Sequence, residues 1–129
     1  MIVRIVRLSI KPEHADEFYR LFRETYTAIR GFEGCSELQL FHDADDENLF
    51  ITYSHWESEE HLNEYRQSEL FKTTWAAVKP LFSNAPQAFS MKHLYPTTNE
   101  QGPAPALLEF PSPKLDASRD TIEEESAQG

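Results

Sequence analysis

The chain has 129 residues, of which 40% are hydrophobic and 12% aromatic, which suits one domain with a packed core. Its formal net charge of -10 argues against nucleic acid or an anionic membrane surface as partners, because both are bound through clustered lysine and arginine. The single cysteine, Cys35, excludes an internal disulfide, and no apolar run approaches the length of a membrane span, so we expect a cytoplasmic protein.

The first third of the chain predicts a strand followed by a helix. Residues 2–10 are β-branched and apolar, which is typical of a strand. Pro12 suits a first helical turn, and acidic residues follow it, as they do at helix N-termini. Apolar side chains then recur every three or four residues, at Ala15, Phe18, Phe22, Tyr26 and Ile29. Gly31 and Gly34 are expected to end this helix and turn the chain.

The next part of the domain predicts two strands, a broken helix and a last strand. Residues 35–42 and 49–56 are the strands, and "DADDEN" between them lacks the central glycine of a calcium loop, so we expect a solvated hairpin. Ser58 caps the following helix, which we expect to break near residues 67–68 and resume through Val78. Residues 87–95 form the last strand. The order βαββαβ over residues 1–95 predicts a ferredoxin-like α+β domain.

The predicted third strand is apolar on both faces. Leu49, Ile51 and Tyr53 point one way, whereas Phe50 and Trp56 point the other. Two helices cover only one face of a four-stranded sheet, so the other face needs a partner. We therefore expect a homodimer whose two sheets pack face to face.

Residues 96–129 form an acidic, proline-rich tail. They contain two basic and seven acidic residues and five of the eight prolines. Such a segment has too little apolar surface to offset its ordering entropy. It includes one apolar island, Leu107, Leu108 and Phe110, so we expect a tail that is partly disordered or that docks through this island.

Several kinds of chemistry are missing from the sequence. Four glycines, two of them in the tail, cannot form a glycine-rich phosphate loop or a dinucleotide fingerprint, and no GxSxG elbow is present. The histidines at 14, 42, 55, 61 and 93 form no HxxxH pair and no cluster with cysteine. We therefore expect neither a metal site nor a nucleotide cofactor.

Several stretches together resemble a known family. They are "VRLSIKPEHADEFYRLF", "GFEGC", "FITYSHWESEEHLNEYRQSELFK" and the last strand. Within residues 1–95 the chain resembles the antibiotic biosynthesis monooxygenase domains of the dimeric α+β barrel superfamily. The resemblance implies cofactor-independent oxygenation of a small aromatic or quinol-like substrate, in a pocket between the sheet and the helices.

The same family includes haem-degrading members, and the resemblance allows their key positions to be placed here. Their first-strand asparagine corresponds to Val6, their second-helix tryptophan to Tyr65 and their haem-ligating histidine to Trp75. All three residues differ from the haem-degrading pattern. Because the imidazole is replaced, haem would have no axial ligand at this point, so we expect no haem.

Candidate site residues follow from the predicted helix and strand faces. We expect Tyr65 and Trp75, with Val6, Leu62 and Phe71, to form the walls of a substrate pocket; helix-to-sheet packing is the alternative role for the aromatic residues. An oxygenase without a cofactor needs a base and an anion stabiliser. We predict His61 or His55 as the base. Arg4, on an otherwise apolar strand face, is the predicted anion stabiliser. The alternative function is a non-catalytic ligand-binding or interaction module that retains the fold.

Overall fold

A computed structural model describes residues 1–96 of the chain. The elements in order are β1 (Ile2–Ser9), α1 (Ala15–Arg30), β2 (Cys35–His42), β3 (Leu49–Trp56), α2 (Glu59–Arg66), α3 (Glu69–Val78) and β4 (Gln87–Lys92). Two short 3-10 turns, Pro12–His14 and Lys79–Leu81, precede α1 and follow α3. The predicted tail and its apolar island lie beyond the described residues, apart from Pro96.

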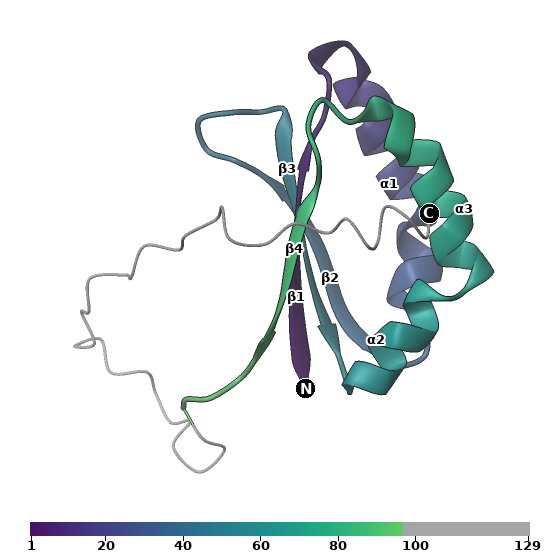
Figure 1. The fold of residues 1–129 in the computed structure, drawn as a ribbon, viewed down its shortest axis with the longest axis vertical. Coiled ribbons are helices and arrows are strands. Elements are labelled where there is room, and N and C mark those ends of the chain that lie inside the picture. Colours follow the sequence, from purple (N-terminus) through teal and green to yellow (C-terminus); the bar gives the residue numbers. More distant parts are fainter. Residues whose placement is uncertain (97–129) are drawn as a thin grey trace.

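The four strands form one antiparallel sheet in the order β2-β3-β1-β4. The central strand β1 pairs with both β3 and β4, which is the arrangement expected of a ferredoxin-like fold. Figure 1 shows that the helices α1, α2 and α3 all cover the same face of the sheet. The predicted α+β ferredoxin-like fold is thus confirmed.

The second helical region is broken because two serines each start a helix. The Ser58 hydroxyl accepts a hydrogen bond from the His61 N–H and caps α2. The Ser68 hydroxyl likewise accepts one from the Phe71 N–H and caps α3. Both serines have extended backbone conformations, as capping residues usually do. The predicted break near residues 67–68 is confirmed.

Gly34 fixes the turn between α1 and β2. Its φ is 94°, a conformation that side-chain-bearing residues rarely adopt. A Cβ atom added there would lie 2.4 Å from the Cβ and Cγ atoms of His61. The close approach brings the start of α2 against this turn, and the Glu57 N–H donates a hydrogen bond to the Gly34 carbonyl at 2.8 Å.

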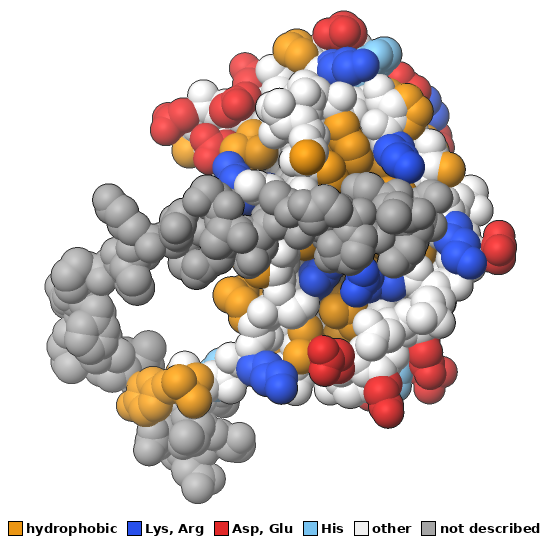
Figure 2. Space-filling view, in the orientation of Figure 1, with side chains coloured by type: hydrophobic (Ala, Val, Ile, Leu, Met, Phe, Trp, Pro, Cys, Tyr) orange, Lys and Arg blue, Asp and Glu red, His pale blue; other side chains and the backbone are white. Residues whose placement is uncertain are grey.

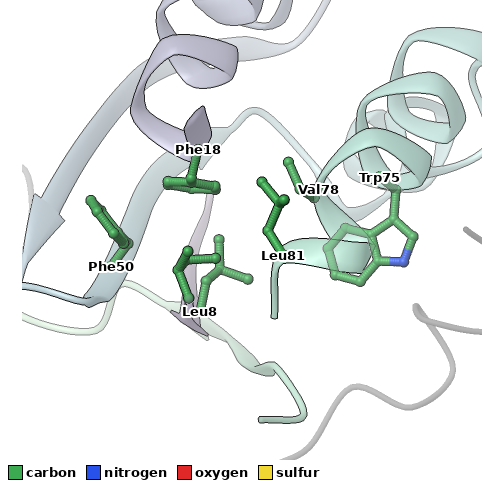
Figure 3. Packing of buried hydrophobic residues seen from close by; sticks show 7 residues of the cluster. Leu8, Phe18, Phe50, Trp75, Val78 and Leu81 are labelled. Atoms are coloured by element: carbon green, nitrogen blue, oxygen red, sulfur yellow. The ribbon is translucent and has the colours of Figure 1, made fainter. Parts of the chain in front are cut away.

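Two clusters of buried side chains join the helices to the sheet. The first, drawn in Figure 3, brings Leu8 and Phe50 from the sheet against Phe18 of α1 and Trp75 and Val78 of α3. The second surrounds Trp56 at the other end of the sheet and consists of Ile2, Ile29, Cys35, Leu38, Trp56 and Leu62. Cys35 is buried in it, as a small apolar side chain would be.

No helix in residues 1–96 covers the opposite face of the sheet (Figure 1). Strand pairing places these apolar side chains on that face: Val3, Ile5, Phe41, Ile51, Tyr53, Phe89 and Met91. Phe41 is 50% exposed and Met91 40% exposed, so this face presents large apolar groups to its surroundings. We call it the open face.

Candidate functional site

A cavity of ≈ 130 Å³ lies between the sheet and the helices, in the space that separates the two buried clusters. The sheet contributes alternate residues of β1 and β3, because every second side chain of a strand points to the same face. All three helices contribute to the walls. The cavity is mainly apolar, and its aromatic lining residues are Phe18, Phe22, Trp56, Tyr65, Phe71 and Trp75.

The polar residues that line the cavity include two arginines. Arg4 reaches it from β1 and Arg66 from the end of α2. The other polar lining residues carry hydroxyl groups: Thr25, Thr52, Ser54, Tyr65 and Thr74. No aspartate, glutamate or histidine of residues 1–96 is among the lining residues. The cavity therefore offers hydrogen-bond donors and positive charge, but no carboxylate or imidazole to accept a proton.

The position of Arg4 is set by strand pairing. In the register of the sheet, Arg4 lies between Ser54 of β3 and Ser90 of β4. Its guanidinium donates a solvent-exposed hydrogen bond to the Ser90 hydroxyl at 2.9 Å. The guanidinium is thus directed toward β4, the edge strand beside β1.

Tyr65 lies at the centre of an aromatic group. Its ring stacks on Trp56 with centroids 4.9 Å apart, and it meets Phe32 and Phe71 edge-on at 5.4 and 5.2 Å. Burial raises the pKa of Tyr65 far above its ordinary value, and the nearby Cys35 thiol adds to this effect. The Tyr65 hydroxyl therefore stays protonated at neutral pH, so it can donate a hydrogen bond but cannot serve as a base.

Trp75 belongs both to the first buried cluster and to the cavity wall. Its ring stacks on Phe71, with centroids 5.8 Å apart and planes within 9°. The indole Nε1 is buried, and no hydrogen-bond acceptor among the described residues pairs with it. In Figure 3 this nitrogen points away from Leu8 and Phe50. By contrast, Nε1 of Trp56 donates to the Ser54 hydroxyl at 3.0 Å.

Comparison with known proteins assigns the chain to a family. The sequence profile of antibiotic biosynthesis monooxygenases (ABM) matches residues 1–77, which include β1, α1, β2, β3, α2 and most of α3. The chain belongs to the ABM family. Family membership supports a monooxygenase function at the level of the family. No curated protein matches the ABM chain at a significant level.

Solved structures similar to this ABM protein agree in fold. A crystal structure of an antibiotic biosynthesis monooxygenase has a TM-score of 0.69 and 23% identity, and the match covers 74% of this chain and 100% of that one. Rv0793 from Mycobacterium tuberculosis has a TM-score of 0.69 and 21% identity, and the match covers 75% of this chain and 98% of that one. PA3566 from Pseudomonas aeruginosa has a TM-score of 0.66 and 22% sequence identity, and the match covers 73% of this chain and 94% of that one. At these identities the likeness establishes the fold alone.

The cavity of this ABM domain brings together most of the side chains singled out from the sequence. Arg4, Val6, Leu62, Tyr65, Phe71 and Trp75 all line it. Val6, Tyr65 and Trp75 are also the positions that we predicted, from the resemblance alone, to correspond to the haem-degrading residues. An indole N–H is a donor without a lone pair for iron, so the Trp75 side chain cannot act as an axial ligand.

The two predicted bases do not line the cavity. The His61 Nδ1 lies 2.7 Å from the Ser58 hydroxyl, and its Nε2 lies 3.9 Å from the Glu57 carboxylate. His55 lies on the open face, where its Nε2 is 2.7 Å from the Tyr53 hydroxyl. A catalytic role for either histidine remains a prediction that the cavity itself does not require.

Sequence reasoning overlooked Arg66 and the hydroxyl residues. Arg66 is four residues after Leu62, so the two side chains share one face of α2. That spacing was the available signal, but an arginine in the last turn of a helix is also common on exposed surfaces. Thr52 and Ser54 alternate with the residues of the open face and are small enough to be overlooked in a strand pattern.

Two further observations concern cofactors and membranes. Within the described residues, no group of three or more histidine, cysteine, aspartate or glutamate side chains is arranged to hold a metal ion. No helix in the same part of the chain has both the length and the apolar character needed to cross a bilayer.

Proposed function

We propose that this ABM-family protein is a cofactor-independent monooxygenase that acts on a small phenolic or quinol-like aromatic molecule. The observation that carries the proposal is the cavity itself, which has aromatic walls and two guanidiniums. Aromatic walls favour a flat, apolar substrate, and the guanidiniums favour its anion. Family membership supports the reaction class.

The size of the cavity limits the substrate. Its volume is ≈ 130 Å³. An apolar cavity of about 150 Å³ holds benzene, so the cavity accommodates roughly one aromatic ring. A fused two-ring or three-ring substrate would require the helices to move away from the sheet. We therefore propose a single-ring substrate.

The reaction needs an electron-rich anion and dioxygen. The substrate O–H first loses its proton, and Arg4 and Arg66 stabilise the resulting phenolate while Tyr65 donates a hydrogen bond. The anion gives one electron to dioxygen, and superoxide then forms a C–O bond with a ring carbon of the resulting phenoxyl radical. Loss of water from the peroxide leaves a carbonyl on that carbon. One oxygen atom enters the product and the other leaves as water, and both reducing equivalents come from the substrate.

The proton can leave without a base inside the cavity. Positive charge nearby lowers the pKa of a phenol because it stabilises the anion, so the proton can pass to water at the cavity mouth. His61 and His55, the bases predicted from the sequence, are then not needed. Turnover that rises with pH and survives His61→Gln would support this route. A loss of turnover in His61→Gln, with normal folding and substrate binding, would restore His61 as the base.

We also propose that the protein is a homodimer joined through the open face. The exposed apolar side chains of this face support the proposal, as does family membership. Two open faces packed together would form a closed α+β barrel with the helices outside. Each cavity would then lie on the outer side of its own sheet, with the same residues as in one chain.

Oxygen uptake with a panel of single-ring quinols tests the function. We expect consumption of dioxygen without added flavin, metal or haem. Arg4→Gln should reduce turnover of the active compound, whereas Arg20→Gln should not. The control removes the same charge from an exposed position on α1, outside both the cavity lining and the open face. An equal loss of turnover in both variants, or no oxygen uptake with any quinol, would argue against the proposal.

A non-catalytic binding module is the second candidate. It is favoured by the lack of any carboxylate or imidazole in the cavity lining of the described residues. In that case quinols or their analogues should bind and raise the melting temperature, while oxygen consumption stays at the buffer rate. Catalysis requires both binding and uptake, so the two measurements made on one sample separate the candidates.

A further inference from the structure

We propose that the physiological ligand of the cavity is a single-ring aromatic acid, with its carboxylate held by Arg4 and Arg66 and its ring between the aromatic walls. The inference deepens the proposed function, because it specifies the substrate class of the same cavity. It does not depend on oxygenation, since the ligand would bind in this way with or without a reaction.

The sign of the charge is the first argument. The whole chain carries a formal net charge of -10, yet the cavity is lined by two guanidiniums and no described carboxylate. A second hollow, beside the start of α1 and the β2–β3 loop, has the opposite character. Among the described residues, it is lined by Asp16 and Glu47 and by no lysine or arginine. In the view of Figure 2 the acidic side chains lie mostly toward the edges, whereas basic ones lie both near the centre and at the edges.

The number of donors is the second argument. Each guanidinium presents five N–H donors, and its planar fork matches the two oxygens of a carboxylate. A single phenolate oxygen can accept one hydrogen bond from each guanidinium, but only the two oxygens of a carboxylate match the planar fork of a guanidinium. A carboxylate is also already ionised at neutral pH, whereas a free phenol would have to lose its proton inside a mainly apolar cavity.

The position of the donors is the third argument. The Arg4 guanidinium donates a solvent-exposed hydrogen bond to Ser90 of β4, so this polar part of the cavity lining lies near solvent. The stacked rings of Trp56 and Tyr65, 4.9 Å apart, and those of Phe71 and Trp75, 5.8 Å apart, lie in the apolar interior. An amphipathic ligand with a ring at one end and a carboxylate at the other fits this order of groups.

Calorimetric binding of benzoate, benzamide and 2-naphthoate to the full chain tests the inference. Benzamide has nearly the shape of benzoate without its charge, and 2-naphthoate adds a ring. We expect benzoate to bind roughly tenfold or more tightly than benzamide, because a hydrogen bond to a charged group is the stronger kind. Added salt should weaken benzoate binding, and 2-naphthoate should bind more weakly than benzoate.

Two arginine variants locate the site. Arg66→Gln should weaken benzoate binding roughly tenfold, and Arg66→Lys should weaken it less because the charge is kept. Arg20→Gln is the control: it removes the same charge from an exposed position on α1, where Arg20 pairs with Glu24. Circular dichroism checks that each variant is folded. If Arg66→Gln does not fold, the comparison of benzoate with benzamide in the unaltered chain decides.

The results distinguish this inference from the proposed function. Equal binding of benzoate and benzamide, no binding of benzoate, or no effect of Arg66→Gln in a folded variant would overturn the aromatic-acid ligand. Oxygen uptake with an uncharged quinol would leave the proposed function standing even then. Selective benzoate binding without oxygen uptake from any hydroxybenzoate would support the inference and reject the monooxygenase.

Discussion

Trp75 and Trp56 provide a matched pair for testing the buried contacts around the cavity. Both indoles are buried, 7% and 1% exposed, and both line the cavity. They differ in one respect: Nε1 of Trp56 donates to Ser54, whereas Nε1 of Trp75 has no acceptor among the described residues. Replacing each tryptophan by phenylalanine therefore removes a satisfied N–H in one case and an unsatisfied N–H in the other.

The two changes should have different effects on the free energy of unfolding. Each leaves a void, for which we estimate about 1 kcal/mol, since whole Trp→Ala truncations cost about 3–5 kcal/mol. Trp56→Phe also leaves the Ser54 hydroxyl, 6% exposed, without its donor, which costs about 1–3 kcal/mol more. Trp75→Phe instead removes a buried unpaired donor, which should raise the free energy of unfolding by about 1–3 kcal/mol. We expect a loss of about 2–4 kcal/mol for Trp56→Phe and a change within about 2 kcal/mol of zero for Trp75→Phe.

Urea unfolding followed by far-ultraviolet circular dichroism measures both values on one scale. The chain has only two tryptophans, so each variant keeps a single fluorescent probe next to the cavity. Coincident transitions by the two signals would support two-state analysis. Equal destabilisation of the two variants would refute the reasoning, because it would mean that Nε1 of Trp75 has an acceptor after all.

Four further predictions concern the rest of the molecule. Gly34→Ala should destabilise the protein by at least about 2 kcal/mol in the same urea assay, because of its positive φ and the contact with His61; a neutral effect would contradict the turn geometry. Sedimentation should show a dimer at micromolar concentration that Ile51→Asp converts to a monomer, and a monomeric unaltered chain would remove this proposal. Reconstitution with haem should give no stoichiometric Soret band, because the indole of Trp75 in the cavity wall cannot ligate iron; one haem per chain would show that another side chain binds the iron. A chain cut after Tyr95 should melt within a few degrees of the full chain, since both described core clusters precede that residue, and a large drop would show that the tail contributes to stability.

Most of the fold follows from local patterns in the sequence. The bounds of β2 and β3 agree with prediction because Gly34, "DADDEN" and Glu57 delimit two uninterrupted strand patterns. Ser58 and Ser68 mark the helix starts because their hydroxyls bond to backbone N–H groups three residues ahead, which is a local interaction. Short-range rules are enough for such features.

The site was harder to predict because it depends on contacts between distant segments. Arg4 could be singled out because a charge on an apolar strand face is conspicuous in the sequence. The position of His61 could not be predicted in the same way. Its side chain packs against Gly34, which is far from it in the sequence, and such a contact leaves no local pattern. His55 alternates with Trp56 along β3 and so lies on the other face, a distinction that becomes clear only once the helix-covered face is known.

The alternation of side chains along β1 has a consequence for how such proteins can diversify. Arg4, Val6 and Leu8 belong to the cavity face, while Val3 and Ile5 belong to the open face. Substitutions on one face can therefore change ligand preference while leaving the other face untouched. A deletion of one residue would exchange both sets at once, moving the Arg4 guanidinium from the cavity face to the open face. New specificities in this lineage should accordingly arise by point substitution within the strands, and changes in length should be confined to the loops.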